Sequence, residues 1–138
     1  AFQNSGGTRT DISNNEIITL ATLYEVWPFD NVIKTVYLDG AIINNLKATS
    51  LIYYTEITEF EAGVLYKVAT NDYVFDKDNA FLNGEQIEYT GIILRDLVEQ
   101  ELLDQALVYD KFYYVNDIQT IEKKKGCLGI LFHFLEPE

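Results

Sequence analysis

The chain has 138 residues, a length typical of one domain, and 48% of them are hydrophobic, which is enough to build a core. Asp and Glu number 22 against 10 Lys and Arg, so the formal net charge is −12 at pH 7. Phosphates and anionic lipid headgroups would repel such a chain, so its composition argues against direct contact with nucleic acid or with a membrane. The single cysteine, Cys127, excludes an internal disulfide and favours a reducing compartment.

The N-terminal region divides into a polar stretch and an ambiguous one. Residues 1–11 are small and polar, which predicts a flexible N-terminal arm in front of one globular domain over residues 12–138. Ser13 and Glu16 have the spacing of a helix capping box, but the β-branched residues that follow them favour a strand. We expect a strand over residues 13–26, with a helix as the alternative.

Two glycine-containing turns predict β-hairpins in the middle of the chain. Asp39-Gly40 follows the strand-forming run 32–38 and precedes a second run at 41–43. Such a dipeptide supplies the positive φ angles that a two-residue hairpin turn needs. Asn83-Gly84 marks a similar turn further along the chain. Other runs of β-branched and aromatic residues predict strands at 51–54, 64–69, 73–75, 80–82 and 86–89.

One later segment has the period of a helix. Apolar residues recur at Leu94, Val98 and Leu102 while acids occupy much of the rest, which predicts one amphipathic helix around residues 92–108. Two closing strands are expected after it, at 112–115 and 126–135. The predicted fold class is therefore mainly β (α+β), an antiparallel sandwich or barrel-like sheet that carries this one helix.

No catalytic constellation can be assembled from the sequence. His133 is the one histidine, and on a shared strand it would lie about 20 Å from Cys127 at ~3.3 Å per residue, too far for a nucleophile–base pair. One Cys and one His also exclude the common zinc sites. We expect no enzyme, no catalytic residue, no metal and no cofactor. A loose calcium site near Asp76 and Asp78 stays open, because oxygen-rich turns can hold calcium.

The central strands carry a recognisable spacing. Gly63, Tyr66 and Val68 follow one another as Gly, two residues, Tyr, one residue, Val, and the pattern continues through 73–75 to Asn83-Gly84. This pattern resembles small β modules of structural and accessory proteins of tailed-phage particles, although the Gly-Asp-x-Phe turn usual in those modules is absent here. The resemblance implies a particle component with a mobile N-terminal arm as a docking element, and it transfers no functional residue.

Two functions fit a chain without a catalytic set. The first is a non-enzymatic structural or interaction module of a larger assembly, a phage virion component that contacts other proteins, including copies of itself, and is located in the virion after assembly in the cytoplasm. The alternative is an acidic, soluble cytoplasmic inhibitor or immunity-type protein whose acidic stretch 72–117 covers a basic partner. The residues expected to make protein contacts are Phe2, Ile12, Tyr53, Tyr54, Tyr113 and Tyr114.

Overall fold

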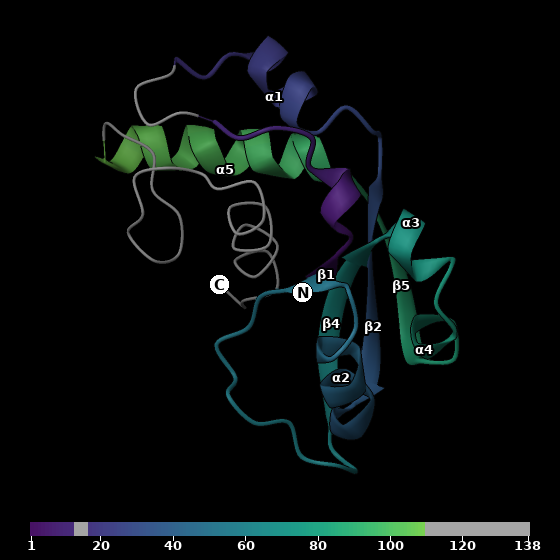
Figure 1. Ribbon diagram of the computed structural model, residues 1–138. Helices are drawn as coiled ribbons and strands as arrows, with labels where there is room; N and C mark the ends of the chain where they lie inside the picture. The colour runs from purple at the N-terminus through teal and green to yellow at the C-terminus, as the bar shows by residue number, and fades with distance from the viewer. Residues whose placement is uncertain (13–16, 110–138) are drawn as a thin grey trace.

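The computed structural model describes residues 1–12 and 17–109, which are built around a three-stranded antiparallel sheet (Figure 1). The strands have the order β4-β2-β5, namely β4 (Leu65–Asn71), β2 (Val32–Asp39) and β5 (Glu85–Ile93). A two-stranded antiparallel sheet pairs β1 (Phe2–Gln3) with β3 (Ile52–Tyr53). Because residues 33–36 of β2 are all buried, this central strand is covered on both of its faces.

Helices pack around the sheet in two groups. Helices α1 (Leu20–Val26) and α5 (Leu94–Tyr109) lie together at the end of the sheet seen at the top of Figure 1. Helices α2 (Gly40–Lys47), α3 (Asp72–Phe75) and α4 (Asn79–Leu82) pack on the strands. The 3-10 helix η1 (Ser5–Gly7) belongs to the N-terminal turn that follows β1. Among the residues that the structure describes, no helix is both long and apolar enough to cross a membrane.

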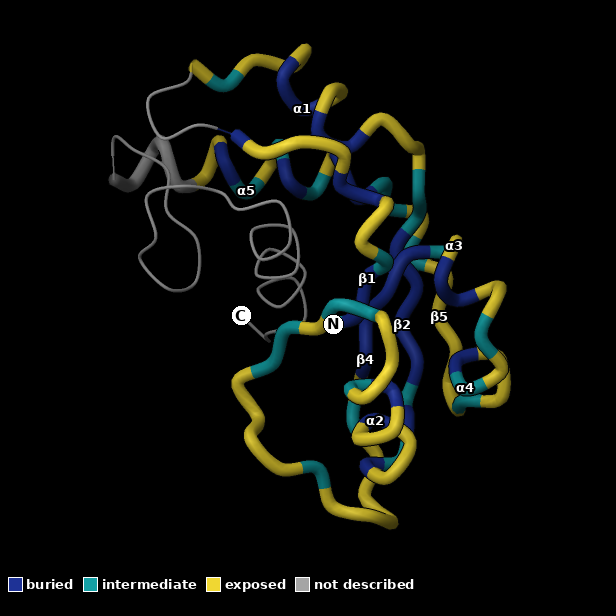
Figure 2. The backbone as a smooth tube through the Cα atoms, viewed as in Figure 1, coloured by how far each residue is buried: buried dark blue, intermediate teal, exposed yellow. Residues whose placement is uncertain are grey.

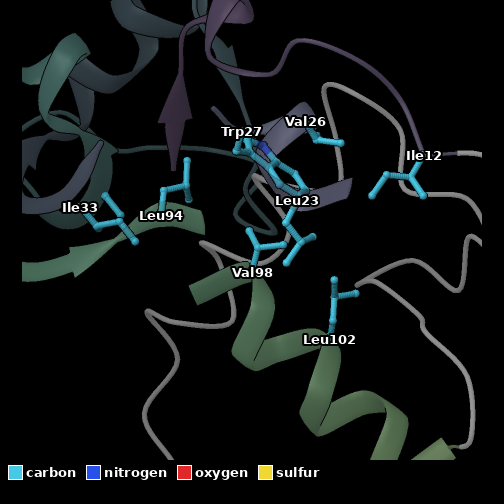
Figure 3. Close-up of a cluster of buried hydrophobic side chains, with 9 residues drawn as sticks. Ile12, Leu23, Val26, Trp27, Ile33, Leu94, Val98 and Leu102 are labelled. Atoms are coloured by element: carbon cyan, nitrogen blue, oxygen red, sulfur yellow. The ribbon is translucent and has the colours of Figure 1, made fainter. Parts of the chain in front are cut away.

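The buried hydrophobic residues form two clusters, and β2 contributes to both. Figure 2 shows that β2 is formed largely by buried residues. In the first cluster, apolar side chains of α1 and α5 meet Ile33 of β2 (Figure 3). In the second, Val36 and Leu38 of β2 pack with side chains of α2, α3 and α4. The aromatic members of the second cluster are Phe2, Phe75 and Phe81. β2 therefore connects the two clusters.

The predicted hairpin turn at Asp39-Gly40 is wrong, because this dipeptide begins helix α2. Asp39 is the N-cap: one carboxylate oxygen accepts a hydrogen bond from the N–H of Ala41 at 2.8 Å and the other accepts from the N–H of Gly63 at 2.7 Å. Aspartate is among the preferred N-cap residues. Gly40 has no positive φ; it serves a close approach, since an added Cβ would lie 2.2 Å from the carbonyl oxygen of Glu61.

Residues 20–26 form helix α1 in place of the expected strand. The N-cap is Thr19, whose hydroxyl accepts from the N–H of Thr22 at 3.3 Å, while the Thr22 hydroxyl accepts from the N–H of Thr19 at 3.1 Å. This reciprocal capping box, together with burial of the apolar side of α1 against α5, outweighs the strand preference of the β-branched residues. The capping box proposed over residues 13–16 lies outside the described residues.

Two of the short predicted strands are instead helices α3 and α4. Asn71 caps α3 by accepting from the N–H of Val74 at 2.8 Å, and Asp78 caps α4 by accepting from the N–H of Ala80 at 2.9 Å. Side chains that bond to nearby backbone give a segment an alternative to pairing in a sheet. The predictions corrected here are the strands at 73–75 and 80–82.

The predicted α+β class, with an antiparallel sheet and one long amphipathic helix, is confirmed. The helix expected around 92–108 is α5, in which Leu94, Val98 and Leu102 are buried as the apolar period predicts. The strands expected at 32–38 and 86–89 lie within β2 and β5, and the one expected at 64–69 overlaps β4, which begins at Leu65. The closing strands expected at 112–115 and 126–135 lie outside the described residues.

Several residues at the start of the chain pair or pack with the rest of the domain, while the flexibility of the arm expected over residues 1–11 stays a prediction. Phe2 pairs with Tyr53 in the small sheet, its side chain is 3% exposed, and its ring lies 6.0 Å from that of Phe81. Ile12 is equally buried in the cluster of α1 and α5. The apolar partners of these residues lie far along the chain, so the composition of residues 1–12 alone could not predict that they are buried. The domain boundary at residue 12 stays a prediction.

Candidate functional site

A cavity of about 310 Å³, called the main cavity below, opens where three stretches of the chain meet. The first stretch is the N-terminal turn over residues 4–9, the second is the loop over 27–31 between α1 and β2, and the third is the start of α3. The side chains and backbone that line the cavity belong to Asn4, Gly6, Arg9, Phe29, Asn31 and Tyr73.

The N-terminal turn is held by a buried polar contact. The hydroxyl of Thr8 accepts hydrogen bonds from Nε2 of Gln3 at 3.1 Å and from the indole Nε1 of Trp27 at 3.2 Å. The backbone N–H of Arg9 donates to the carbonyl of Val26 at 2.8 Å. These bonds join the first stretch to the end of α1, so the turn that carries Arg9 is anchored on the same helix as the loop that follows it.

The 27–31 loop is fastened by the first residues of α5. Nη1 of Arg95 donates to the carbonyl of Trp27 at 2.8 Å, and Nη2 forms an ion pair with Asp30 at 2.5 Å. The N–H of Leu94 donates to the carbonyl of Asn31 at 2.8 Å. Burial of the guanidinium is the largest single influence and lowers its pKa, but the hydrogen bond and charge of Asp30 together with the neighbouring Tyr24 outweigh it, and the pKa of Arg95 is raised. The loop that presents Phe29 and Asn31 is therefore fixed at both ends.

The third stretch presents Tyr73 from the first turn of α3. Asn71, which caps this helix, also donates from Nδ2 to Oδ1 of Asn4 at 3.0 Å. The Nζ of Lys77 lies 3.7 Å from the centre of the Tyr73 ring, a cation–π contact. Asn71 thus joins the start of α3 to the N-terminal turn.

The cavity combines aromatic, cationic and amide groups. Phe29 is 47% exposed and Tyr73 is 50% exposed, so each leaves an aromatic surface open to a ligand. The guanidinium of Arg9 lies 5.8 Å from the centre of the Phe29 ring. Aromatic surfaces stack on flat rings, amides hydrogen-bond to the ring edges, and a guanidinium matches the geometry of a phosphate or carboxylate. Such a set suits a flat heteroaromatic ligand that carries an anionic group.

Two other hollows lie in the described part of the chain. A smaller one, of about 170 Å³, shares Asn4 and Tyr73 with the first cavity and is also lined by Lys77 and Asp78. Tyr73 therefore stands between the two. A shallow groove of about 410 Å³ lies between α2 and α4 and is lined mainly by apolar atoms and asparagine side chains.

The described contact residues predicted from the sequence do not line the main cavity. Phe2 and Ile12 are buried in the core of the domain. That they contact a partner stays a prediction. Tyr53 is 43% exposed beside β1 and Tyr54 is half-buried. The two remaining predicted residues, Tyr113 and Tyr114, lie outside the described residues.

The carboxylates considered for calcium have other partners. Asp76 forms an ion pair with the buried Lys34 at 2.7 Å, and Asp78 caps α4. Within residues 1–12 and 17–109, no three His, Cys, Asp or Glu side chains gather closely enough to hold a metal ion.

Sequence reasoning missed the residues that line the cavity. Phe29 follows Trp27-Pro28, which predicts only the end of an element, and the residues around Tyr73 predict a strand in place of helix α3. The one signal in the sequence is an aromatic residue placed directly after a proline in a loop, where no core position requires it.

Comparisons with known proteins found one similar family and a similar solved structure. The model of the 5′-nucleotidase C-terminal domain family matches residues 1–48, which include every lining residue of the main cavity except Tyr73. The crystal structure of a 5′-nucleotidase precursor from Thermus thermophilus is similar to 67% of this chain, with 22% sequence identity and a TM-score of 0.52. The chain covers 26% of that protein. No curated protein matches the chain.

The chain is similar, over residues 1–48, to the C-terminal domain family of 5′-nucleotidases. Its described part shares a fold with a portion of the Thermus protein. The resemblance to phage modules is therefore wrong, and so are the virion function, the virion location and the inhibitor alternative. The physical reason is that the Gly63–Tyr66–Val68 spacing lies around strand β4, and alternating aromatic and β-branched residues occur in many antiparallel strands. The family match rests on residues outside that pattern.

Proposed function

We propose that this domain binds the nucleoside part of a nucleotide in the cavity between Phe29 and Tyr73. The observation that carries the proposal is that two half-exposed aromatic side chains, one from a loop and one from helix α3, line one cavity together with Arg9 although they are far apart in the sequence. A base that stacks on an aromatic side chain gains about 1–3 kcal/mol, and every base has such a face. The amides of Asn4 and Asn31 are available to the polar edge of the base.

The charge of the site supports a phosphorylated ligand. The chain as a whole is acidic, with a net charge of −12, so a phosphate needs local cations to approach it. Arg9 lines the cavity, and Lys77 lies beside the wall that Tyr73 forms. The planar guanidinium of Arg9 can donate two parallel hydrogen bonds to a phosphate.

The comparisons favour the same ligand class. The matching family and the Thermus protein are both named 5′-nucleotidases, and that name denotes a nucleotide as the molecule they act on. In this proposal the chain binds the substrate and is itself not the enzyme, and a separate domain carries out the hydrolysis. Contact with other proteins, and the lack of contact with nucleic acid or membrane, stay predictions.

Binding of adenosine and of AMP to the full chain tests the proposal by isothermal titration calorimetry. Phe29→Ala and Tyr73→Ala each remove a stacking surface, so each should weaken adenosine binding by about five- to fiftyfold. Arg9→Gln should weaken AMP binding by about five- to tenfold and leave adenosine binding unchanged within twofold, since adenosine has no phosphate.

A matched control is Tyr89→Ala, which removes a 69% exposed tyrosine on β5 that does not line the cavity. This variant should bind both ligands as the parent does. The proposal is wrong if neither ligand binds saturably at millimolar concentration, or if Tyr89→Ala weakens binding as much as Tyr73→Ala does.

A further inference from the structure

The orientation of one buried amide can be deduced from a backbone group. Asn71 is 1% exposed, and its side-chain oxygen accepts from the N–H of Val74 at 2.8 Å. A backbone N–H can only donate, so the atom of Asn71 that faces it must be the oxygen. The amide nitrogen of Asn71 therefore points the other way, toward Asn4, to which it donates at 3.0 Å.

This orientation fixes the amide of Asn4 in turn. Because the Asn71 nitrogen can only donate, the atom of Asn4 that meets it must be Oδ1. The Nδ2 of Asn4 is left for another partner, and no described residue accepts a hydrogen bond from it. It lies 3.7 Å from the place where a Cβ of Gly6 would be, and both residues line the main cavity. The Nδ2 of Asn4 is thus available to donate a hydrogen bond to a ligand in the cavity.

Capping of α3 alone does not require asparagine at position 71. Aspartate, serine and threonine also accept a hydrogen bond from the first turn of a helix, and aspartate does so about as well. What distinguishes asparagine from all three is the additional N–H₂ group, and here that group is bonded to Asn4. The second bond of Asn71 therefore has a role besides capping.

We propose that Asn71 is a positioning residue that fixes the polarity of the Asn4 amide, so that the cavity selects a ligand with a hydrogen-bond acceptor at that place. The inference rests on the proposed function and adds to it the chemistry of one ligand position. A ring nitrogen of a purine is such an acceptor. A ligand that lacks it would leave the Asn4 N–H unpaired, at a cost in affinity.

The test compares adenosine with 1-, 3- and 7-deazaadenosine, each of which lacks one ring acceptor. In the parent chain, one of the three analogues should bind about five- to tenfold more weakly than adenosine, because Asn4 loses its acceptor. In Asn71→Asp, the carboxylate still caps α3 but has no N–H, so it accepts from Nδ2 of Asn4 and turns that amide over. The difference between adenosine and that analogue should then fall to within twofold.

A second variant keeps the proposal testable if Asn71→Asp does not fold. Asn4→Asp removes the same donor while Asn71 stays unchanged, and it should lose the same discrimination. Asn45→Asp is the matched control, since it makes the same chemical change at an exposed residue of α2 outside the main cavity, and it should discriminate as the parent does.

The possible failures can be told apart. If the parent chain binds none of the nucleosides saturably, the proposed function itself is wrong. If it binds adenosine and all three analogues equally, or if Asn71→Asp and Asn4→Asp keep the preference of the parent, only the role assigned to Asn71 is wrong. A merely structural role for Asn71 would weaken all four ligands by the same factor.

Discussion

Arg95→Met should lower the melting temperature by about 10 °C. The methionine fills much the same space but cannot donate, so the Trp27 carbonyl loses a charge-assisted bond that is worth about 1.5–3 kcal/mol. The ion pair with Asp30 adds at most about 1 kcal/mol, because the side chain of Asp30 is 73% exposed and solvent screens it. A total near 3 kcal/mol corresponds to roughly 10 °C in a domain of this size.

Thermal unfolding followed by far-ultraviolet circular dichroism measures the effect, and Asp30→Asn separates its two components. Asp30→Asn weakens only the screened ion pair, so its melting temperature should fall by no more than about 3 °C. The reasoning fails if Arg95→Met melts within about 3 °C of the parent, or if Asp30→Asn is as damaging as Arg95→Met. The second result would place the stabilisation in the ion pair and not in the buried hydrogen bond to the loop.

Two further substitutions test how the segments around the site are built. Gly40→Ala should destabilise the domain by about 1–3 kcal/mol, since its Cβ would lie 2.2 Å from the backbone oxygen of Glu61, and an unchanged urea midpoint would contradict the close approach. Trp27→Phe keeps the aromatic ring in the core but loses the indole bond to Thr8, so the free energy of unfolding should fall by about 1–2 kcal/mol. No loss of stability in urea would mean that this bond contributes nothing.

The sequence predicted those elements whose residue pattern, within the segment itself, is enough to determine the structure. Strand β2 is rich in β-branched residues, and helix α5 repeats its apolar residues with a helical period, so both could be placed without knowledge of the rest. Asp39-Gly40 could not be resolved in this way, because the same dipeptide serves a hairpin turn and a helix N-cap. The choice depends on the backbone of Glu61 and Gly63, which lies beside it only in the folded chain.

The candidate site could not be predicted from short stretches of sequence, for a related reason. Arg9, Phe29 and Tyr73 come from three separate stretches, and nothing in their spacing places them at one cavity. Each stretch is held by a buried polar side chain that contacts a distant segment, such as Arg95 for the 27–31 loop. The composition of the N-terminal stretch predicts a flexible arm. It gives no sign that Phe2 is buried, because the residues that cover Phe2 lie much further along the chain.

Tyr73 has a further consequence as the residue between the two neighbouring hollows. It lines both a space of about 310 Å³ and one of about 170 Å³, and Asn4 also lines both. The size of the side chain at position 73 therefore affects how much room each of the two spaces offers. A related chain with a small residue here would have more room beside both Phe29 and Lys77, so a change at this single position is a direct route by which such domains could come to accept larger ligands.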